Sequence, residues 1–239
     1  MSPGSSVWSL PWSRVELIGA TIANQLGTRA ARGEAMTGQR GYLVSKRLLD
    51  VAVAGAAWLA MSPLLVLIAL LVKWTSPGPV FYRWRVVGQG GRYFIAHKFR
   101  TMHRHADREK ERLLAANEMT GPVFKMTDDP RVTAFGKVLR RYSLDELPQL
   151  CSVIQGNMSL VGPRPPLQRE YEQFNDWQRQ KLSVKPGVTC LWQIQGRNRI
   201  SDFDQWVRLD LEYISRRNLR LDLMILADTL KSVIQGTGK

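Results

Sequence analysis

The chain has 239 residues, a formal net charge of +14 and two cysteines, Cys151 and Cys190. So few cysteines exclude a disulfide framework or a cysteine-rich metal site, and they favour a reduced, cytoplasm-facing domain. The hydrophobic content of 44% is sufficient for a buried core, and the positive charge predicts a polyanionic partner: nucleic acid, an anionic membrane surface or a phosphorylated substrate.

Residues 1–40 are rich in glycine, serine, alanine and arginine, and they predict an N-terminal extension that is partly disordered or amphipathic. Within it, Val15, Ile18, Ile22 and Leu26 have the spacing of one face of a short amphipathic helix. The first residues lack the basic start, apolar run and small-residue cleavage site of a secretory signal, so we expect none.

Residues 51–72 form the longest apolar run, which carries no charge and exceeds the ~20 residues needed to span a bilayer. Ser62 and Pro63 interrupt this run near its middle. Because proline removes a helical hydrogen bond and clashes with the preceding turn, we expect a sharp bend there. Ser62 is placed to satisfy a backbone group that the proline leaves unpaired.

Basic residues flank the apolar run on both sides, with Lys46 and Arg47 before it and Lys73, Arg83 and Arg85 after it. The positive-inside rule therefore places both ends on the cytoplasmic face. A helix that crosses the bilayer once cannot satisfy this rule, whereas a bent helix that enters and leaves by one face can. Residues 41–75 are thus predicted to form a re-entrant membrane helix, with a single kinked span as the alternative.

The sequence after this helix predicts an α+β, predominantly helical domain over residues 76–239. Two strand-like segments, 80–87 and 92–99, flank the turn sequence GQGG and predict a β-hairpin. The last helical segment, 219–234, suits either the core or the membrane interface. Helical patterns also cover 103–118, 132–141, 165–182 and 201–215. A further helix is expected to begin within residues 143–150 and to end near residue 154.

The stretch SLDELPQL, residues 143–150, is open to a structural interpretation. Ser143 and Glu146 have the spacing of a capping box, in which each side chain satisfies a backbone amide of the first helical turn. Acidic residues favour a helix N-terminus, and Pro148 is tolerated in a first turn. On this interpretation Asp145 and Glu146 belong to a helix start and carry no chemistry.

The surroundings of the same stretch favour a chemical interpretation. A helix N-terminus binds anions, and arginines donate paired hydrogen bonds to phosphate and keep a neighbouring carboxylate ionised. An ionised Asp145 held beside phosphate-binding groups can attack a phosphorus atom. Glu146 can bind Mg²⁺, which uses one or two carboxylates together with substrate phosphates. Three arginines are available for this purpose, Arg140, Arg141 and Arg164.

From residue 42 to the end, the chain resembles the bacterial sugar transferase family, the monotopic polyprenyl-phosphate phosphoglycosyl transferases. Each motif by itself is weak, but the ordered set is highly specific. In chain order the motifs are KRLLD (46–50), SP (62–63), SPGPVF (76–81), KFRTM (98–102), DPRVT (129–133), SLDELPQL (143–150), MSLVGPRP (158–165) and KPGVT (185–189).

The resemblance implies transfer of a sugar-1-phosphate from a UDP-sugar to polyprenyl (undecaprenyl) phosphate with release of UMP, the first membrane step of exopolysaccharide or lipopolysaccharide synthesis. It implies a ping-pong mechanism through a covalent phosphosugar on Asp145, with Glu146 as the Mg²⁺ ligand. It also implies phosphate or active-site contacts by Lys98, Arg140 and Arg164, and an acidic residue near the site at Asp210. The sequence itself adds Arg100 and Arg141 as further candidates for substrate binding.

The resemblance also implies a small catalytic domain that faces the cytoplasm, anchored at the bacterial inner membrane by the bent re-entrant helix and interfacial amphipathic helices. Membrane lipids are then partners, nucleic acid is not, and a homodimer remains open. Cys190 departs from the pattern, because many relatives have glycine after the Pro-Gly-Val-Thr sequence. The sugar and the pathway are not determined.

Two alternatives from other functional classes remain open at this stage. A basic, membrane-tethered nucleic-acid-binding protein agrees with the charge, although no reading helix or RNA-binding motif is recognisable. A glycosyltransferase that moves the sugar alone would release UDP. The Asp202-Phe203-Asp204 sequence matches the metal motif of such enzymes, but a solvated acidic pair is the favoured interpretation.

Overall fold

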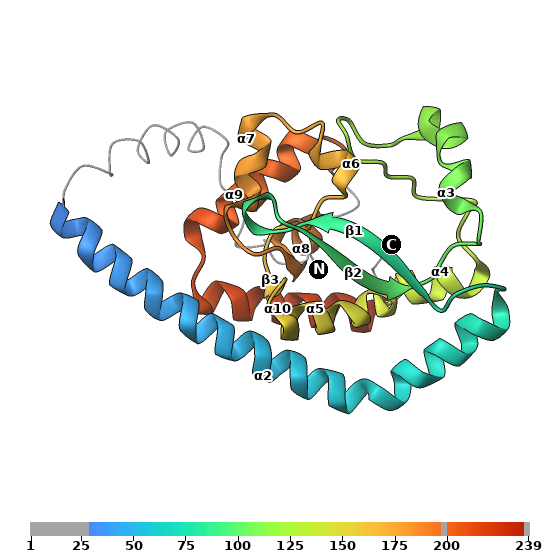
Figure 1. Cartoon of the computed structure of the whole chain (residues 1–239), viewed down its shortest axis with the longest axis horizontal. Coiled ribbons are helices and arrows are strands. Elements are labelled where there is room, and N and C mark those ends of the chain that lie inside the picture. The colour runs from blue at the N-terminus through green and yellow to red at the C-terminus, as the bar shows by residue number, and fades with distance from the viewer. Residues whose placement is uncertain (1–28, 197–199, 237–239) are drawn as a thin grey trace, which may run out of the picture. The chain divides into compact units, whose positions relative to one another are not determined.

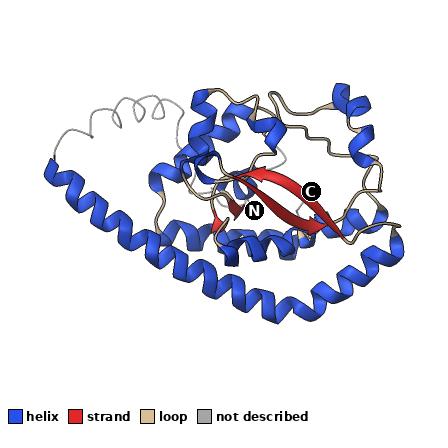
Figure 2. Cartoon of the chain, viewed as in Figure 1, coloured by secondary structure: helices blue, strands red, loops and turns tan. Residues whose placement is uncertain are grey.

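The computed structural model describes residues 29–196 and 200–236 (Figures 1 and 2). The amphipathic helix expected near the start of the chain lies outside these residues. The chain divides into two compact units, Met1–Val44 and Ser45–Lys239. In the first unit the described residues form the beginning of helix α2 (Arg29–Thr75), and the rest of this description concerns the second unit.

Helix α2 contains the apolar run and is long and apolar enough, from Gln39 to Thr75, to cross a membrane. Figure 1 shows that it changes direction along its length. Pro63 lies inside the helix and cannot donate a hydrogen bond to the carbonyl of Leu59, four residues earlier. The Ser62 Oγ donates to this carbonyl instead, at 2.8 Å, which confirms the predicted role of Ser62.

The predicted hairpin is confirmed. Strands β1 (Phe81–Val87) and β2 (Tyr93–Phe99) pair in antiparallel register, with Phe81 opposite Phe99 and Val87 opposite Tyr93. The turn between them contains Gly90 with φ of 66°, a left-handed conformation that glycine adopts at little steric cost. The hairpin places alternate side chains of β2, including Lys98, on one face of the sheet.

A second, parallel pair of strands was not predicted. Strand β3 (Ser159–Val161) pairs with β4 (Gly187–Thr189), so that Ser159 lies opposite Gly187. The two backbones approach so closely at Gly187 that a Cβ added there would lie 2.1 Å from the Gly162 nitrogen. A pairing between two three-residue strands leaves too little pattern to detect in the sequence.

The predicted helices near 132–141, 201–215 and 219–234 are confirmed. The predicted helices at 103–118 and 165–182 are instead broken into short pieces, and the second begins only after Pro165-Pro166. The structure assigns these elements as α3 (Ala106–Glu109), η2 (Glu111–Ala116), α4 (Ala134–Arg141), η3 (Leu144–Gln149), α5 (Leu150–Gln155), α6 (Gln168–Tyr171), α7 (Asp176–Arg179), η4 (Gln180–Ser183), α8 (Leu191–Gly196), α9 (Phe203–Arg216) and α10 (Leu219–Gln235).

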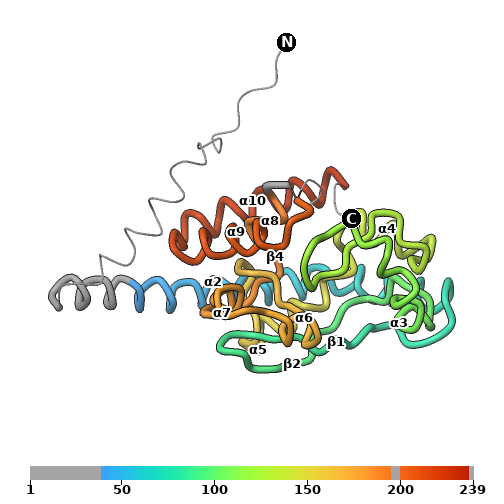
Figure 3. Tube along the Cα trace, turned by 90° about the horizontal axis from the view of Figure 1, so that it is seen from above, coloured from blue at the N-terminus to red at the C-terminus, as the bar shows by residue number. Residues whose placement is uncertain are grey.

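The two arms of α2 on either side of Pro63 pack against different parts of the same domain. The first arm contributes Ala54 to a core formed by α5, β3, α8, α9 and α10. The second arm contributes Leu65, Ile68 and Val72, spaced as one helical face, to a core with Phe99 of β2 and Leu139 of α4. Seen from above, α10 and the β1–β2 hairpin lie on opposite sides of the line of α2 (Figure 3).

The Lys46-Arg47-Leu48-Leu49-Asp50 sequence joins the first arm of α2 to this domain. Lys46 Nζ lies 2.9 Å from a carboxylate oxygen of Asp222 on α10. The Arg47 guanidinium donates to the last carbonyls of α5, at 2.6 and 2.8 Å. The buried Asp50 carboxylate accepts from the Leu160 backbone amide at 3.0 Å. The side chains of this motif therefore attach the apolar helix to the domain that follows it.

Candidate active site

A cavity of about 1080 Å³ opens between the β1–β2 hairpin, η3, α4 and the loops around residues 119–131 and 164–170. Seven of the eight predicted site residues line it: Lys98, Arg100, Arg140, Arg141, Asp145, Glu146 and Arg164. Asp210 is not part of the lining. Segments that are distant in the sequence thus bring most of the predicted residues to one place.

The carboxylates of Asp145 and Glu146 are carried by the 3-10 helix η3, which continues into α5. The capping-box prediction is wrong, because the Ser143 side chain makes no capping hydrogen bond. Ser143 instead has φ of 52°, and it is the one non-glycine residue with positive φ in the described part of the chain. Such a conformation costs about 1–3 kcal/mol and is concentrated at functional sites.

Arg164 faces the carboxylate of Glu146 from the loop after β3. Its Nη1 lies 3.5 Å from Oε1 of Glu146, and its guanidinium lies 5.7 Å from the centre of the Trp84 ring. The close backbone approach of Gly162 and Gly187 fixes the start of this loop. The β3–β4 pair therefore determines where Arg164 lies relative to Glu146.

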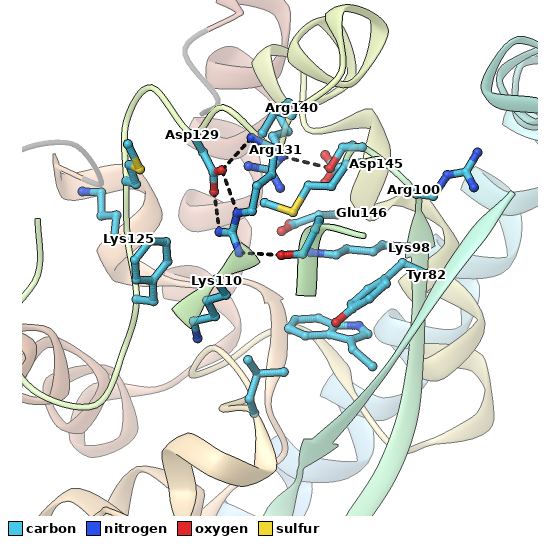
Figure 4. Close-up of a pocket in the computed structure, with 18 of the residues that line it drawn as sticks. Tyr82, Lys98, Arg100, Lys110, Lys125, Asp129, Arg131, Arg140, Asp145 and Glu146 are labelled. Atoms are coloured by element: carbon cyan, nitrogen blue, oxygen red, sulfur yellow. Dashed lines mark hydrogen bonds and ion pairs between the residues drawn. The ribbon is translucent and has the colours of Figure 1, made fainter. Parts of the chain in front are cut away.

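Lys98 extends from β2 toward Glu146, with Asp145 close by (Figure 4). Its Nζ lies 4.9 Å from the Trp84 ring centre and 5.5 Å from that of Tyr82. Burial lowers the pKa of Lys98 to about 8; Arg140 and Arg164 lower it too, whereas Asp145 and Glu146 raise it. At pH 7 the ammonium group is thus mostly charged, but its proton is much more labile than that of an exposed lysine.

The other three arginines of the prediction differ in orientation. Arg140 lines the cavity and its Nε donates to the Thr101 hydroxyl at 3.0 Å. Arg141 is exposed at the cavity edge, beside the ring of Tyr142 at 5.7 Å. Arg100 turns away from Asp145 and Glu146 (Figure 4), and its guanidinium donates to the carbonyls of Ser76 and Pro77 at 2.6 and 2.9 Å. These contacts give Arg100 a role in holding the turn that follows α2.

Asp210 lies on α9 and is completely buried. Its Oδ2 lies 2.7 Å from Nζ of Lys181, which is buried as well. Burial raises the pKa of Asp210, and the positive charges of Lys181 and Arg164 oppose this effect. Asp210 is therefore electrostatically coupled to Arg164 but does not itself reach the cavity.

The sequence interpretation missed the basic and aromatic outer wall of the cavity. Arg131 forms a paired contact with the buried Asp129 carboxylate, with Nε 2.8 Å from Oδ1. The Arg131 guanidinium and the Lys110 ammonium lie 5.2 and 5.3 Å from the ring centre of Phe124. The DPRVT sequence contains both Asp129 and Arg131, but their spacing in the sequence does not show that Arg131 packs against the loop that carries Phe124.

The loop that carries Phe124 is held by side-chain hydrogen bonds. The Asn117 amide accepts from the backbone of Met119 and Lys125 and donates to two carbonyls of the same loop. Glu118 accepts from the amide and hydroxyl of Thr127 at 2.7 and 2.6 Å. This wall of the cavity is thus a folded loop with its own internal bonds.

The donor set fits a magnesium ion held in part by its substrate. Among the described residues, no group of three or more His, Cys, Asp and Glu side chains converges on one point. Adjacent carboxylates of Asp145 and Glu146 supply hard oxygen donors, which suit Mg²⁺ when substrate phosphates and water complete the shell. The residues therefore fit Mg²⁺ that enters with a phosphorylated ligand and do not form a complete protein cage.

Two other sequence candidates have structural roles. Cys190 is buried in the aromatic core around Trp192 and Trp206, and burial raises the pKa of its thiol to about 12. This thiol is uncharged at neutral pH. Asp202 is the N-cap of α9, accepting from the amides of Asp204 and Gln205, which agrees with a non-catalytic interpretation of this acidic pair.

Comparison with known proteins identifies relatives across most of the chain. The family model described as "Bacterial sugar transferase" matches residues 41–236. "Galactosyl transferase CpsE" of Streptococcus agalactiae is 45% identical over 197 residues, which cover 82% of this chain and 44% of that protein. "Exopolysaccharide production protein ExoY" of Sinorhizobium fredii is 42% identical over 199 residues, 82% of this chain and 88% of its own length.

A third relative has a printed name that states its substrates more fully. "Undecaprenyl-phosphate galactose phosphotransferase" of Salmonella typhimurium is 38% identical over 197 residues, which cover 81% of this chain and 41% of that protein. The chain therefore spans less than half of the streptococcal and Salmonella relatives and most of ExoY. In each case the similarity includes the region of the cavity.

Proposed function

Because the chain belongs to the bacterial sugar transferase family, we propose that it transfers a sugar-1-phosphate from a UDP-sugar to polyprenyl phosphate. The products are polyprenyl-diphosphate-sugar and UMP, in the first membrane step of a surface glycan pathway. The observation that carries the proposal is the position of Asp145 and Glu146 in a basic cavity with Lys98, Arg140 and Arg164. Relatives named as undecaprenyl-phosphate sugar phosphotransferases support the same reaction.

In the first proposed step, a carboxylate oxygen of Asp145 attacks the phosphorus atom that bears the sugar. A bond forms between this oxygen and phosphorus, and the bond to the bridging oxygen of UMP breaks, so that UMP leaves with the electron pair. Lys98, Arg140 and Arg164 bind the phosphate oxygens and stabilise the charge that moves to the leaving group. The product is a phosphosugar joined to Asp145 as an acyl-phosphate.

In the second step, a phosphate oxygen of the lipid acceptor attacks the same phosphorus atom. The new bond joins the two phosphates, and the bond to Asp145 breaks to regenerate the carboxylate. The acceptor phosphate is already anionic, so this step requires no general base. The basic groups around the cavity lower the repulsion between two anionic reactants.

Glu146 is the residue that would hold Mg²⁺, together with the phosphates of the donor. A bound magnesium ion supplies neutralisation of phosphate charge during transfer. Arg164 lies 3.5 Å from the Glu146 carboxylate and orients it toward the cavity. This role for the cation is a proposal that rests on the donor set of the site.

We also propose that α2 anchors the protein as a bent, re-entrant helix at the inner membrane, with the domain on the cytoplasmic face. Residues on both sides of Pro63 pack on one domain, which supports a location of both ends of the apolar run on the same side of a bilayer. Large apolar side chains remain exposed on both arms, as a lipid-facing surface requires. They include Leu48, Val53, Leu59, Val66, Leu67, Leu70 and Trp74.

The test is purified protein in detergent given Mg²⁺ and a panel of labelled UDP-sugars without a lipid acceptor. One sugar should give stoichiometric UMP release and a phosphosugar adduct on the protein. Asp145→Asn should give neither, whereas Asp204→Asn, at a half-buried α9 position outside the cavity, should behave as wild type. Release of UDP would identify a sugar-only transferase, and normal turnover by Asp145→Asn would refute the covalent step.

A further inference from the structure

A second, smaller cavity of about 160 Å³ adjoins the catalytic cavity, and Glu146 lines both. It lies among η3, α5, β4, α8 and α10. Its wall is largely apolar, and Glu146 is the one charged residue among the described residues that line it. The apolar side chains are Leu147, Leu150, Val188, Ile194 and Val233.

Three of the six polar residues in this wall, Thr189, Thr229 and Gln193, form side-chain hydrogen bonds within the chain. Thr189 and Thr229 share a hydrogen bond of 2.6 Å between their hydroxyls. The Thr229 hydroxyl also reaches the Ile225 carbonyl at 2.7 Å, and the Gln193 side-chain oxygen accepts from the Cys190 amide at 3.1 Å. Because these groups have partners within the chain, the cavity offers an apolar ligand little competition from water.

The size of the cavity restricts its occupant to a fragment of a larger ligand. Pockets for whole small molecules measure about 300–1,000 Å³, whereas an apolar cavity of about 150 Å³ holds benzene, a ring of six carbons. The cavity of about 160 Å³ therefore has room for one five-carbon isoprene unit. A sugar or a nucleotide would be too large and too polar for it.

The cavity also lies at the edge of a surface suited to lipid. Leu223, Leu230 and Ile234 are exposed along one stripe of α10, at 53%, 61% and 73%. Val233 lies one turn after Leu230 on the helix, three residues along, and lines the cavity. An apolar path thus runs from the exposed stripe through the cavity to Glu146, which neighbours the proposed nucleophile.

We propose that this cavity receives the isoprene unit nearest the phosphate of the lipid acceptor, and thereby places that phosphate for attack on the phosphosugar. The inference rests on the proposed function and extends it to a separate acceptor subsite. The donor is bound on the basic side of Glu146 and the acceptor hydrocarbon on its apolar side. The enzyme should therefore distinguish acceptors by the first carbons attached to phosphate.

The experiment compares Val233→Trp, which fills the cavity, with Val138→Trp, an exposed α4 site outside both cavities. The donor is the UDP-sugar identified by the panel, and the acceptors are geranyl phosphate and methyl phosphate. We expect Val233→Trp to raise the KM for geranyl phosphate about tenfold or more. UMP release without acceptor, and transfer to methyl phosphate, should stay within about twofold of wild type for both variants, since neither requires the cavity.

Circular dichroism melting establishes that Val233→Trp is folded, and Val233→Ala provides a second test that removes contacts without filling space. We expect the alanine variant to raise the KM for geranyl phosphate about threefold to tenfold and to leave methyl phosphate unaffected. An unchanged KM in both Val233 variants, with normal UMP release, overturns the inference alone. Absence of UMP release from the wild type overturns the proposed function and the inference with it.

Discussion

Lys181 and Asp210 form an ion pair in the interior of the protein, with Nζ 2.7 Å from Oδ2 and side chains that are 2% and 0% exposed. The ammonium group also lies 4.9 Å from the centre of the Trp206 ring. Asp210 interacts electrostatically with Arg164, which faces Glu146 in the cavity. Asp210 thus interacts with the site through its charge and does not line the cavity.

Removal of one member of this pair should be strongly destabilising. For Lys181→Met we expect a loss of about 3–5 kcal/mol in the free energy of unfolding, because an uncompensated carboxylate remains buried. Denaturant unfolding in detergent gives this value. The matched control is Arg216→Met, which breaks the exposed pair with Glu212 and should cost less than about 1 kcal/mol. Equal effects of the two substitutions would contradict the assignment.

The pH dependence of the donor half-reaction should report the charge of Lys98. Its pKa of about 8 lies below that of a free lysine, so the ammonium group that we propose binds phosphate is lost as the pH rises through 8. We expect kcat/KM for UMP release, which reports the free enzyme, to fall above this pH. The effect of Lys98 on stability has the opposite sign to its effect on activity. Between about pH 8 and pH 10.4 the folded state holds fewer protons than the unfolded state, so the contribution of Lys98 to the free energy of unfolding increases with pH in this range.

Lys98→Arg distinguishes this cause from other pH effects. A guanidinium remains protonated throughout the range tested, so the decline above pH 8 should be absent or shifted upward even if the rate is lower. Lys98→Met should lose the activity at every pH, because no cation remains at that position. A profile in Lys98→Arg that matches the wild type would exclude Lys98 as the titrating group.

Gly187→Ala should disturb the site although Gly187 makes no contact with it. A Cβ there would lie 2.1 Å from the Gly162 nitrogen, so the β3–β4 pair must separate and the loop to Arg164 must move. We expect a loss of about 2–4 kcal/mol in stability, as in overpacked or strained sites, and a large fall in UMP release. Gly55→Ala on α2 is the control, because nothing lies within 4 Å of its added methyl group. Thermal melting and the half-reaction should show no loss for that variant.

The proposed re-entrant arrangement of α2 predicts that both ends of the apolar run react from one side of the membrane. Cysteines introduced one at a time at Ser45 and Arg92, both exposed, flank the run in a Cys151→Ser background, in which the remaining Cys190 is buried. A membrane-impermeant maleimide should label both sites in inverted vesicles and neither in spheroplasts. Labelling of Ser45→Cys and Arg92→Cys from opposite sides would instead establish a single kinked span.

The bend, the hairpin and the longer helices were predictable because each depends on residues close in the sequence. Pro63 removes one hydrogen bond wherever the helix lies, and the glycines between the strands permit a tight turn in any context. The position of Asp145 in a cavity with basic residues was predictable from the concentration of arginines around it. The capping box failed because it assumed an ordinary helix start, whereas Ser143 has a left-handed backbone.

The sequence by itself determined which residue types were available: a carboxylate pair, a set of cations and an apolar helix interrupted by proline. Only the tertiary structure decided which of them converge. Lys98 and Arg100 are two positions apart, yet one faces Glu146 and the other binds the carbonyls of Ser76 and Pro77. Asp210 was assigned to the site and lies in the core with Lys181. These outcomes depend on contacts between segments far apart in the chain. A local sequence pattern does not specify which distant residue a side chain will contact.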